Sequence, residues 1–267
     1  MRRRAAVLGG QASRLVLLVV ALAVWQLAAL HAQIRYLPPF SEVVGRFFAD
    51  WFSGPWYHAF FSTAFIENGL PTIGRLAVGW LVAAVLGVAI GTALALAPRL
   101  DATLSPVVRF GMSMPTPALL PLALAIFGLG YGAKVFFIAI GAIWPVIVNT
   151  ADGIRGADPT ALAAARSLSL PPVTWLTRFR IPLASPQIMA GLRVSVNTAV
   201  LLIVVAELYA ATSGIGFFIV STQRNFDTVG TWSGILLLAG LGIVCNALFV
   251  IVERRVMRWH GPAREVQ

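Results

Sequence analysis

Long runs of apolar residues, separated by short polar segments, dominate this chain. A helix needs roughly 20 mostly apolar residues to cross a bilayer. In hydrocarbon every backbone amide must find its partner within the segment, so such runs predict helices and not open strands. The pattern therefore predicts an all-α, polytopic membrane protein with six transmembrane helices. These spans are Leu15–His31, Thr72–Ala97, Leu104–Phe127, Lys134–Asn149, Gln187–Ala210 and Trp232–Val256.

The second and third spans carry distinctive residues. Glycine and alanine recur at every fourth position of the second span, from Gly79 to Ala95, so they lie on one helix face and let another helix approach closely. The third span is interrupted by four prolines, each of which removes a helical hydrogen bond. We expect this span to be kinked or broken, with neighbouring helices or water satisfying the freed carbonyls. The prolines are Pro106, Pro115, Pro117 and Pro121.

Composition agrees with a lipid environment. Hydrophobic residues make up 58% of the 267 residues and charged residues 11%, whereas soluble domains carry about a quarter charged residues. A net charge of +10 in a soluble protein would suggest nucleic acid. Here the basic residues lie between the apolar runs, so membrane topology explains them and no nucleic-acid partner is expected.

The basic residues also orient the chain. With a cytoplasmic N-terminus most arginines fall on the inner side, as the positive-inside rule requires, and both termini are then cytoplasmic. The N-terminal arginines resemble a signal peptide, but the apolar run after them is long enough to span and no convincing cleavage site follows, so we predict a retained first helix. The outer side holds only Arg35, Arg46, Arg75, Lys134 and Arg224.

Three segments follow from this topology. Residues 1–71 form the first transmembrane helix plus an external interfacial segment, in which Val43–Trp51 suits an amphipathic helix on the membrane surface. Residues 72–257 form a five-helix core, and residues 258–267 a cytoplasmic tail. Within the core, residues 151–186 are too polar to span. Two short helices, Thr160–Leu168 and Pro172–Arg180, would make this segment a compact elbow, although an ordinary interhelical loop is the alternative.

Several motifs carry a family resemblance. The run ALAAARSLSLPPVTWLTRFRIPLASPQIMAGLR resembles the coupling loop of permease subunits of binding-protein-dependent ABC importers, with Ala164 and Ala165 matching the alanines of its E-A-A signature and Gly191 opening the next helix. Other runs resemble segments of the nitrate, sulfonate and taurine branch, in the same order. These are YLPPFSEVVGRF, TIGRLAVGW, MPTPALLPLALAIFGLGYGAK and VVAELYAATSGIGFFI.

The resemblance implies a permease subunit in a bacterial cytoplasmic (inner) membrane. Such a chain forms the pathway for a small solute delivered by a periplasmic or lipid-anchored binding protein. Its implied partners are membrane lipid, a second permease subunit and a cytoplasmic ABC ATPase dimer, which binds the ATP and magnesium, so this chain needs no cofactor. The coupling loop lies between the fourth and fifth spans. The implied ATPase-coupling residues are Thr160, Leu162, Ala163, Ala164, Ala165, Arg166, Ser167, Leu168, Ser169 and Trp175.

Two positions depart from the family signature. Its glutamate falls at Ala163 and its glycine at Ser169. A glutamate there can make charge-assisted hydrogen bonds, and a glycine permits a tight turn. Their loss suggests an altered contact with the ATPase. Either the chain pairs with a second, more typical permease, or Arg166 and other groups compensate.

No enzymatic centre is predicted in the chain. It lacks the GxxxxGK[ST] phosphate loop, so it does not itself hydrolyse ATP. The histidines His31, His58 and His260 all flank spans and form no catalytic set, and the single cysteine, Cys245, allows neither an internal disulfide nor a metal cluster. A stand-alone secondary transporter or channel, or a membrane scaffold, are the alternatives. The first would show intramembrane charge pairs and inverted repeats.

Glu207 is the acid predicted inside a span, near the outer end of the fifth. An intramembrane carboxylate is costly and is by default a functional candidate. Asn197 lies almost three turns earlier on nearly the same face, so we predict that both line the translocation pathway. The alternative is that both simply hydrogen-bond to neighbouring helices. The solute itself is not encoded here, although the branch suggests nitrate, sulfonate, taurine, bicarbonate or a small heterocyclic precursor.

Overall fold

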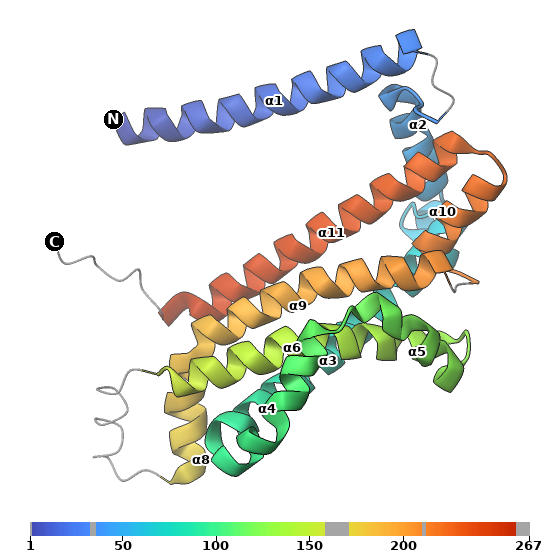
Figure 1. Cartoon of the computed structure of the whole chain (residues 1–267). Helices are drawn as coiled ribbons and strands as arrows, with labels where there is room; N and C mark the ends of the chain where they lie inside the picture. The colour runs from blue at the N-terminus through green and yellow to red at the C-terminus, as the bar shows by residue number, and fades with distance from the viewer. Residues whose placement is uncertain (1, 33–35, 158–170, 210–211, 260–267) are drawn as a thin grey trace. The chain divides into compact units, whose positions relative to one another are not determined.

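The computed structural model describes residues 2–32, 36–157, 171–209 and 212–259, and every regular element in these ranges is a helix (Figure 1). The all-α class predicted from the apolar runs is therefore confirmed. The principal helices are α1 (Arg2–Ala32), α2 (Phe40–Trp51), α3 (Leu70–Leu96), α4 (Pro98–Ser113), α5 (Leu120–Phe127), α6 (Tyr131–Arg155), α8 (Pro172–Trp175), α9 (Ile181–Tyr209), α10 (Ile215–Arg224) and α11 (Thr228–Val256).

Four described helical segments are long and apolar enough to cross a membrane, and a bent pair would add a fifth. The apolar part of α1, Val16–His31, is shorter than these. The count of six spans, like the cytoplasmic termini, therefore stays a prediction. The four segments are Phe65–Leu96, Tyr131–Arg155, Pro172–Tyr209 and Thr228–Val256.

The fifth predicted span begins earlier than expected. The predicted second elbow helix, Pro172–Arg180, runs without a break into α9. A wide, π-type turn at Leu176–Arg180 comes directly before Pro182. Proline has no backbone N–H to donate to the preceding turn, and a wide turn leaves room for its ring. The proline therefore does not end the helix.

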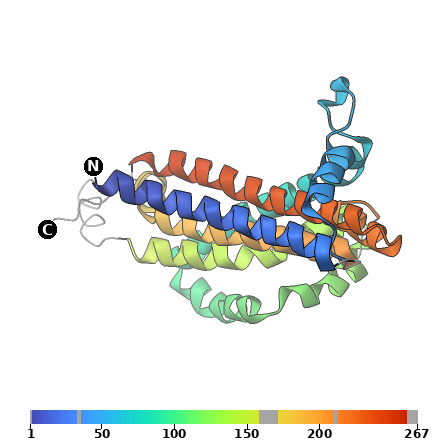
Figure 2. The ribbon, with the colours of Figure 1, turned by 90° about the horizontal axis from the view of Figure 1, so that it is seen from above.

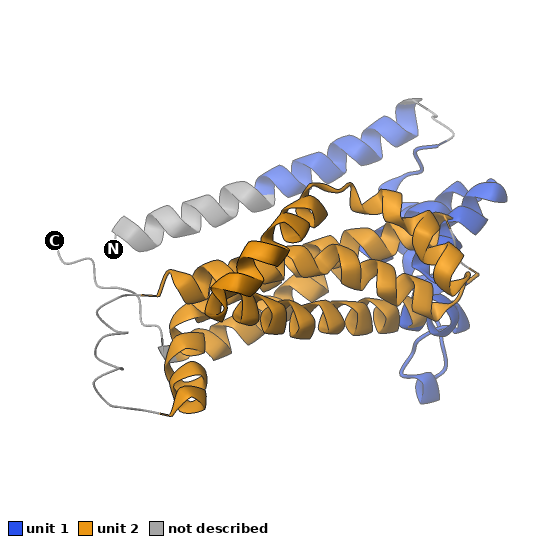
Figure 3. Cartoon of the chain, turned by 60° about the horizontal axis from the view of Figure 1, so that its bottom comes forward, with its two compact units in different colours: residues 1–70, 213–238 blue, residues 71–212, 239–267 orange. Residues whose placement is uncertain are grey.

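The chain divides into two compact units, coloured separately in Figure 3. Unit 1 comprises residues 1–70 and 213–238, and unit 2 comprises residues 71–212 and 239–267. The sequence analysis assigned residues 213–238 to the five-helix core, because α11 is one continuous apolar run. The predicted division into residues 1–71, 72–257 and 258–267 stays a prediction.

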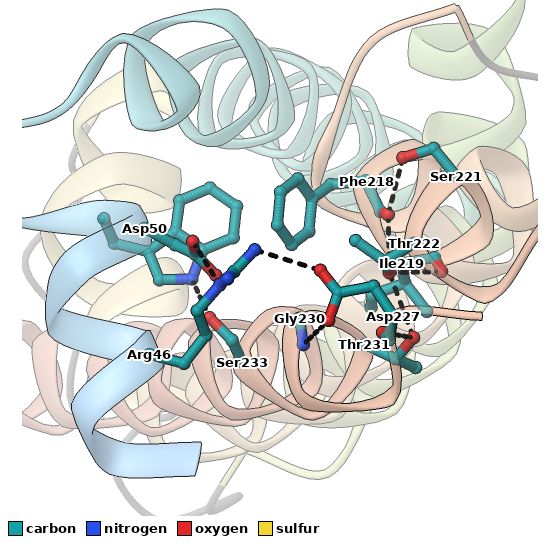
Figure 4. Close-up of polar contacts among 11 residues, drawn as sticks. Arg46, Asp50, Phe218, Ile219, Ser221, Thr222, Asp227, Gly230, Thr231 and Ser233 are labelled. Atoms are coloured by element: carbon teal, nitrogen blue, oxygen red, sulfur yellow. Dashed lines mark hydrogen bonds and ion pairs between the residues drawn. The ribbon is translucent and has the colours of Figure 1, made fainter. Parts of the chain in front are cut away.

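A polar network holds unit 1 together (Figure 4). The Arg46 guanidinium on α2 lies 2.8 Å from an oxygen of Asp50 and 3.0 Å from an oxygen of Asp227. Asp227 precedes α11 and accepts the backbone N–H of Gly230 at 2.8 Å, as a helix-capping aspartate does. The fully buried Trp51 indole donates to Ser233 Oγ at 2.9 Å. These contacts fasten α2 to the start of α11.

In unit 2, α6 and α9 pack along one another (Figures 1 and 2), and α3 approaches α6 through its glycines. A Cβ added at Gly79 would lie 2.8 Å from Ile138, and one added at Gly91 would lie 2.5 Å from the Ile147 carbonyl oxygen. The predicted small-residue face is therefore confirmed as a packing face. The core around it contains buried apolar residues of α3, α5, α6 and α9: Leu76, Ala83, Leu120, Ala123, Phe137, Ile138, Ala142, Ala199, Leu202, Ile203 and Ala206.

The third predicted span is broken, as its prolines indicated. Helix α4 ends at Ser113, a short 3-10 turn covers Thr116–Leu119, and α5 follows. The two halves pass the length and hydropathy requirement together but are bent by 99°.

Because α3 and α6 approach closely, we predict that adding one methyl group at their contact lowers the stability of the protein. Gly91→Ala should lower the thermal stability of the purified complex, by about 1–3 kcal/mol, because the added Cβ meets backbone that cannot move aside. Gly240→Ala in α11 is the matched control, since nothing lies within 4 Å of its added Cβ. Melting curves of both variants decide this, and equal melting temperatures would contradict the packing account.

Candidate functional site

Glu207 of α9 is engaged with two residues of α3. Its carboxylate accepts hydrogen bonds from the Thr72 hydroxyl at 2.8 and 2.9 Å and lies 2.7 Å from Nη1 of Arg75. Glu207 is 1% exposed and Arg75 6%. For Glu207 these contacts agree with the alternative of bonding to a neighbouring helix, because α3 supplies both a charge partner and a hydroxyl donor.

A third charged residue joins this cluster. Lys134, in the first turn of α6, is 1% exposed and interacts electrostatically with both Arg75 and Glu207. From the sequence we placed Arg75 and Lys134 on the outer side, at the starts of two predicted spans, and the structure shows that both side chains are buried. Their position a few residues inside apolar runs was the available signal. It indicates intramembrane cations, which seek an intramembrane acid.

The cluster joins α3, α6 and α9 at one point. Two cations and one carboxylate come together beside Ala206 and the apolar core. Taking charges out of water costs several kcal/mol for each ion, so the carboxylate that pairs with the buried Arg75 cannot be removed cheaply. The geometry offers no nucleophile or general base with access to solute. It does fix three helices relative to one another.

Asn197 has a different environment from Glu207. Its side chain is exposed, whereas Glu207 and nearby Ser195 are buried, and the Ser195 hydroxyl donates to the Ala142 carbonyl at 2.8 Å. Ten residues on a helix amount to a rotation of about 80° away from a common face. The prediction that Asn197 and Glu207 share a face is therefore wrong. A pathway role for either residue stays a prediction.

Most of the predicted coupling residues, Thr160–Ser169, lie outside the described residues. Trp175 is described, at the end of α8, and the Arg180 guanidinium lies 4.4 Å above its ring, a cation–π contact. The end of α6 and the start of α8 lie at the same end of unit 2 (Figure 1).

Arg155 fastens this end of unit 2. Its guanidinium lies 2.6 Å from an oxygen of Asp101 on α4 and donates to the Leu94 carbonyl of α3 at 3.2 Å. It thereby joins the ends of α3, α4 and α6. The described residues hold no group of three or more histidine, cysteine, aspartate or glutamate side chains that could bind a metal ion.

Comparison with known proteins places these features in a family. The family model described as "Binding-protein-dependent transport system inner membrane component" matches residues 83–258. The chain belongs to this family. The match includes α6, α9 and most of α3, together with the segment that the sequence motifs had identified. Members are the multi-pass membrane components of ABC importers, and this component carries no ATPase site.

Similar proteins belong to one branch of that family. Nitrate import permease protein NrtB of Synechococcus elongatus is 35% identical over 252 residues, covering 92% of this chain and 87% of that protein. Putative aliphatic sulfonates transport permease protein SsuC of Bacillus subtilis is 33% identical over 190 residues, covering 71% and 69%. Taurine transport system permease protein TauC of Escherichia coli is 28% identical over 249 residues, covering 92% and 89%. The predicted resemblance to this branch is confirmed.

A solved structure agrees on the fold. A chain of the MetNI methionine ABC transporter, in an inward-facing conformation, aligns with a TM-score of 0.62 at 20% identity. The alignment covers 71% of this chain and 94% of that chain. At this identity the likeness shows the fold alone.

The buried cluster predicts a large effect of removing one charge. Glu207→Gln removes the carboxylate that pairs with the buried Arg75 and should destabilise the complex by about 3–5 kcal/mol. Replacing Arg75 by Gln as well should recover part of the loss. The matched control is Glu253→Gln, whose partner Arg193 is 48% exposed and which should cost about 0–1 kcal/mol.

Melting temperatures of the purified complexes measure these differences. If Glu207→Gln melts like Glu253→Gln while uptake is lost, the carboxylate has a pathway role and not the bracing role that its contacts indicate.

Proposed function

We propose that this chain forms, with a second permease subunit, the membrane pathway of an ATP-driven importer. A binding protein delivers the solute, and a cytoplasmic ATPase dimer binds ATP and magnesium and drives transport. The observation that carries this proposal is the family match over residues 83–258, supported by permeases of similar length. An independent secondary transporter or channel is not favoured, because these relatives are permeases of binding-protein-dependent systems.

The proposed coupling contact is the segment between α6 and α8 together with Trp175. Arg155 and the Trp175–Arg180 contact support it, since they brace the two helix ends from which the segment emerges. The ATPase would press on this segment, and α6 and α9 would transmit the movement because they pack along their length. The proposed location is a bacterial cytoplasmic membrane with both termini inside.

For the solute we propose a small oxyanion or a solute that carries a sulfonate group. The names of the relatives support this class, since nitrate, aliphatic sulfonates, taurine and bicarbonate all present compact anionic oxygens. The binding protein would supply most of the discrimination between them. The pathway would then need only to admit a small hydrated anion.

Charge reversal tests the coupling contact. Arg166→Glu should leave membrane insertion intact and reduce both the co-purification of the ATPase and ATP-driven uptake in vesicles. Arg99→Glu, at an exposed position on the same predicted side, is the control and should behave like the wild type. If Arg166→Glu co-purifies the ATPase and supports uptake as well as the wild type does, Arg166 is not part of the coupling contact.

Calorimetry on the cognate binding protein tests the solute class. Nitrate, bicarbonate, methanesulfonate and taurine form one panel, and methionine with a neutral sugar form the other. We expect binding within the first panel only. Binding of methionine or the sugar, with none of the anions bound, would contradict the proposed class and leave the permease assignment standing.

A further inference from the structure

The break between α4 and α5 leaves polar backbone groups in the middle of a candidate membrane span. Helix α4 ends at Ser113, and Met114 and Pro115 are extended. The two halves, Pro98–Ser113 and Thr116–Phe127, satisfy the requirement for a span only together. Helix ends normally lie in water, where their free carbonyls are hydrated. This end lies where the more polar α4 half meets the apolar α5 half.

The sequence explains why these carbonyls lack partners. In a continuous helix the carbonyls of Gly111 and Ser113 would accept the N–H groups of residues 115 and 117, which are both prolines. The N–H of Ala118 donates to the Pro115 carbonyl at 2.8 Å and not to Met114. Outside the helices, the hydrogen bonds of this segment reach the Phe110 and Pro115 carbonyls, and none of them reaches the carbonyl of Met114.

The break is seated firmly on α6 and is not a frayed end. A Cβ added at Gly111 would lie 2.5 Å from the Trp144 ring, and one added at Gly141 would collide with the Thr116 methyl group. Each glycine therefore allows close contact between the break and α6. On the other side Ser113, Pro115, Pro117 and Ala118 are exposed in this subunit.

A lipid-facing position is not compatible with this arrangement. Each unsatisfied backbone group in hydrocarbon costs several kcal/mol, and irregular backbone at membrane depth persists only where it is buried in protein or lines a water-filled cavity. Packing against apolar side chains of another subunit would exclude the lipid but would supply no hydrogen-bond donors for the carbonyls. Water can supply these donors.

We propose that the break, residues 110–118, lines the water-filled part of the solute pathway. The carbonyls of residues 111–114 accept hydrogen bonds from pathway water and from N–H or O–H groups of the solute. The C-terminal end of a helix, which is the end that α4 presents here, carries partial negative charge. Because this charge repels an anionic group, such a group passes the break with its hydration water. This inference rests on the proposed transport function and adds the broken backbone itself as a contact region.

Cysteine accessibility in the assembled complex tests the inference. In a Cys245→Ser background, Ser113→Cys and Ala118→Cys place a thiol at the break, and Val85→Cys is the control. Val85 is 66% exposed, on a regular stretch of α3 with no broken backbone. A charged, membrane-impermeant thiosulfonate should modify the break positions at least about tenfold faster than Val85→Cys, since a thiol in water ionises more readily than one in apolar surroundings.

Each outcome decides the inference. Fast labelling of Ser113→Cys or Ala118→Cys supports it, and rates equal to that of Val85→Cys in both variants overturn it. If the complex of one cysteine variant melts below the wild-type temperature, the labelling rate of the other variant is used. Labelling needs neither solute nor ATP, so its outcome is independent of transport. Fast labelling at the break, in a protein that never co-purifies with an ATPase, would refute the proposed function alone. Slow labelling at the break, in a complex that imports its solute, would refute this inference alone.

Discussion

The absence of water from hydrocarbon is the constraint on which this structure depends. Every polar group at membrane depth must find a partner in the protein or a route to water. The backbone meets this requirement by forming helices throughout the described residues. Some polar side chains of the core meet it by pairing, as Glu207 does with Thr72 and Arg75. The break after α4 is a place where the helical backbone pairing stops.

These two solutions suit different tasks. A buried ion pair between Arg75 and Glu207 joins α3 to α9, with Lys134 of α6 close enough to interact with both charges. It therefore helps to hold these three helices in register. A break with free carbonyls interacts with whatever passes it, because its hydrogen bonds are not committed. A permease needs both a rigid frame and a polar lining.

Local patterns in the sequence carry the features that were predicted correctly. The apolar runs determine the helices, the spacing from Gly79 to Gly91 determines the packing face, and Pro115 with Pro117 determines the break. Each of these depends on residues within a few turns of one another. The motifs that identified the family are likewise local, and the comparison with known proteins confirmed them.

The errors concern relations across the chain. Arg75 and Glu207 are 132 residues apart in sequence, and no local pattern shows that they meet. Lys134 was placed on the outer side at the start of a span, and its burial beside Arg75 and Glu207 was not foreseen. Asn197 was placed on the face of Glu207 by counting turns too coarsely. Most of the predicted coupling segment lies outside the described residues, so its details stay predictions.

Hydrogen–deuterium exchange of the complete complex in nanodiscs tests the central claim most directly, because it reports which backbone amides meet water at membrane depth. The account predicts slow exchange in α3, α6 and α9 around Arg75, Lys134 and Glu207. Between the start of α4 and the end of α5, we predict that fast exchange is confined to the break, residues 110–118. Uniform protection across the break, or fast exchange around the ion cluster, would contradict it.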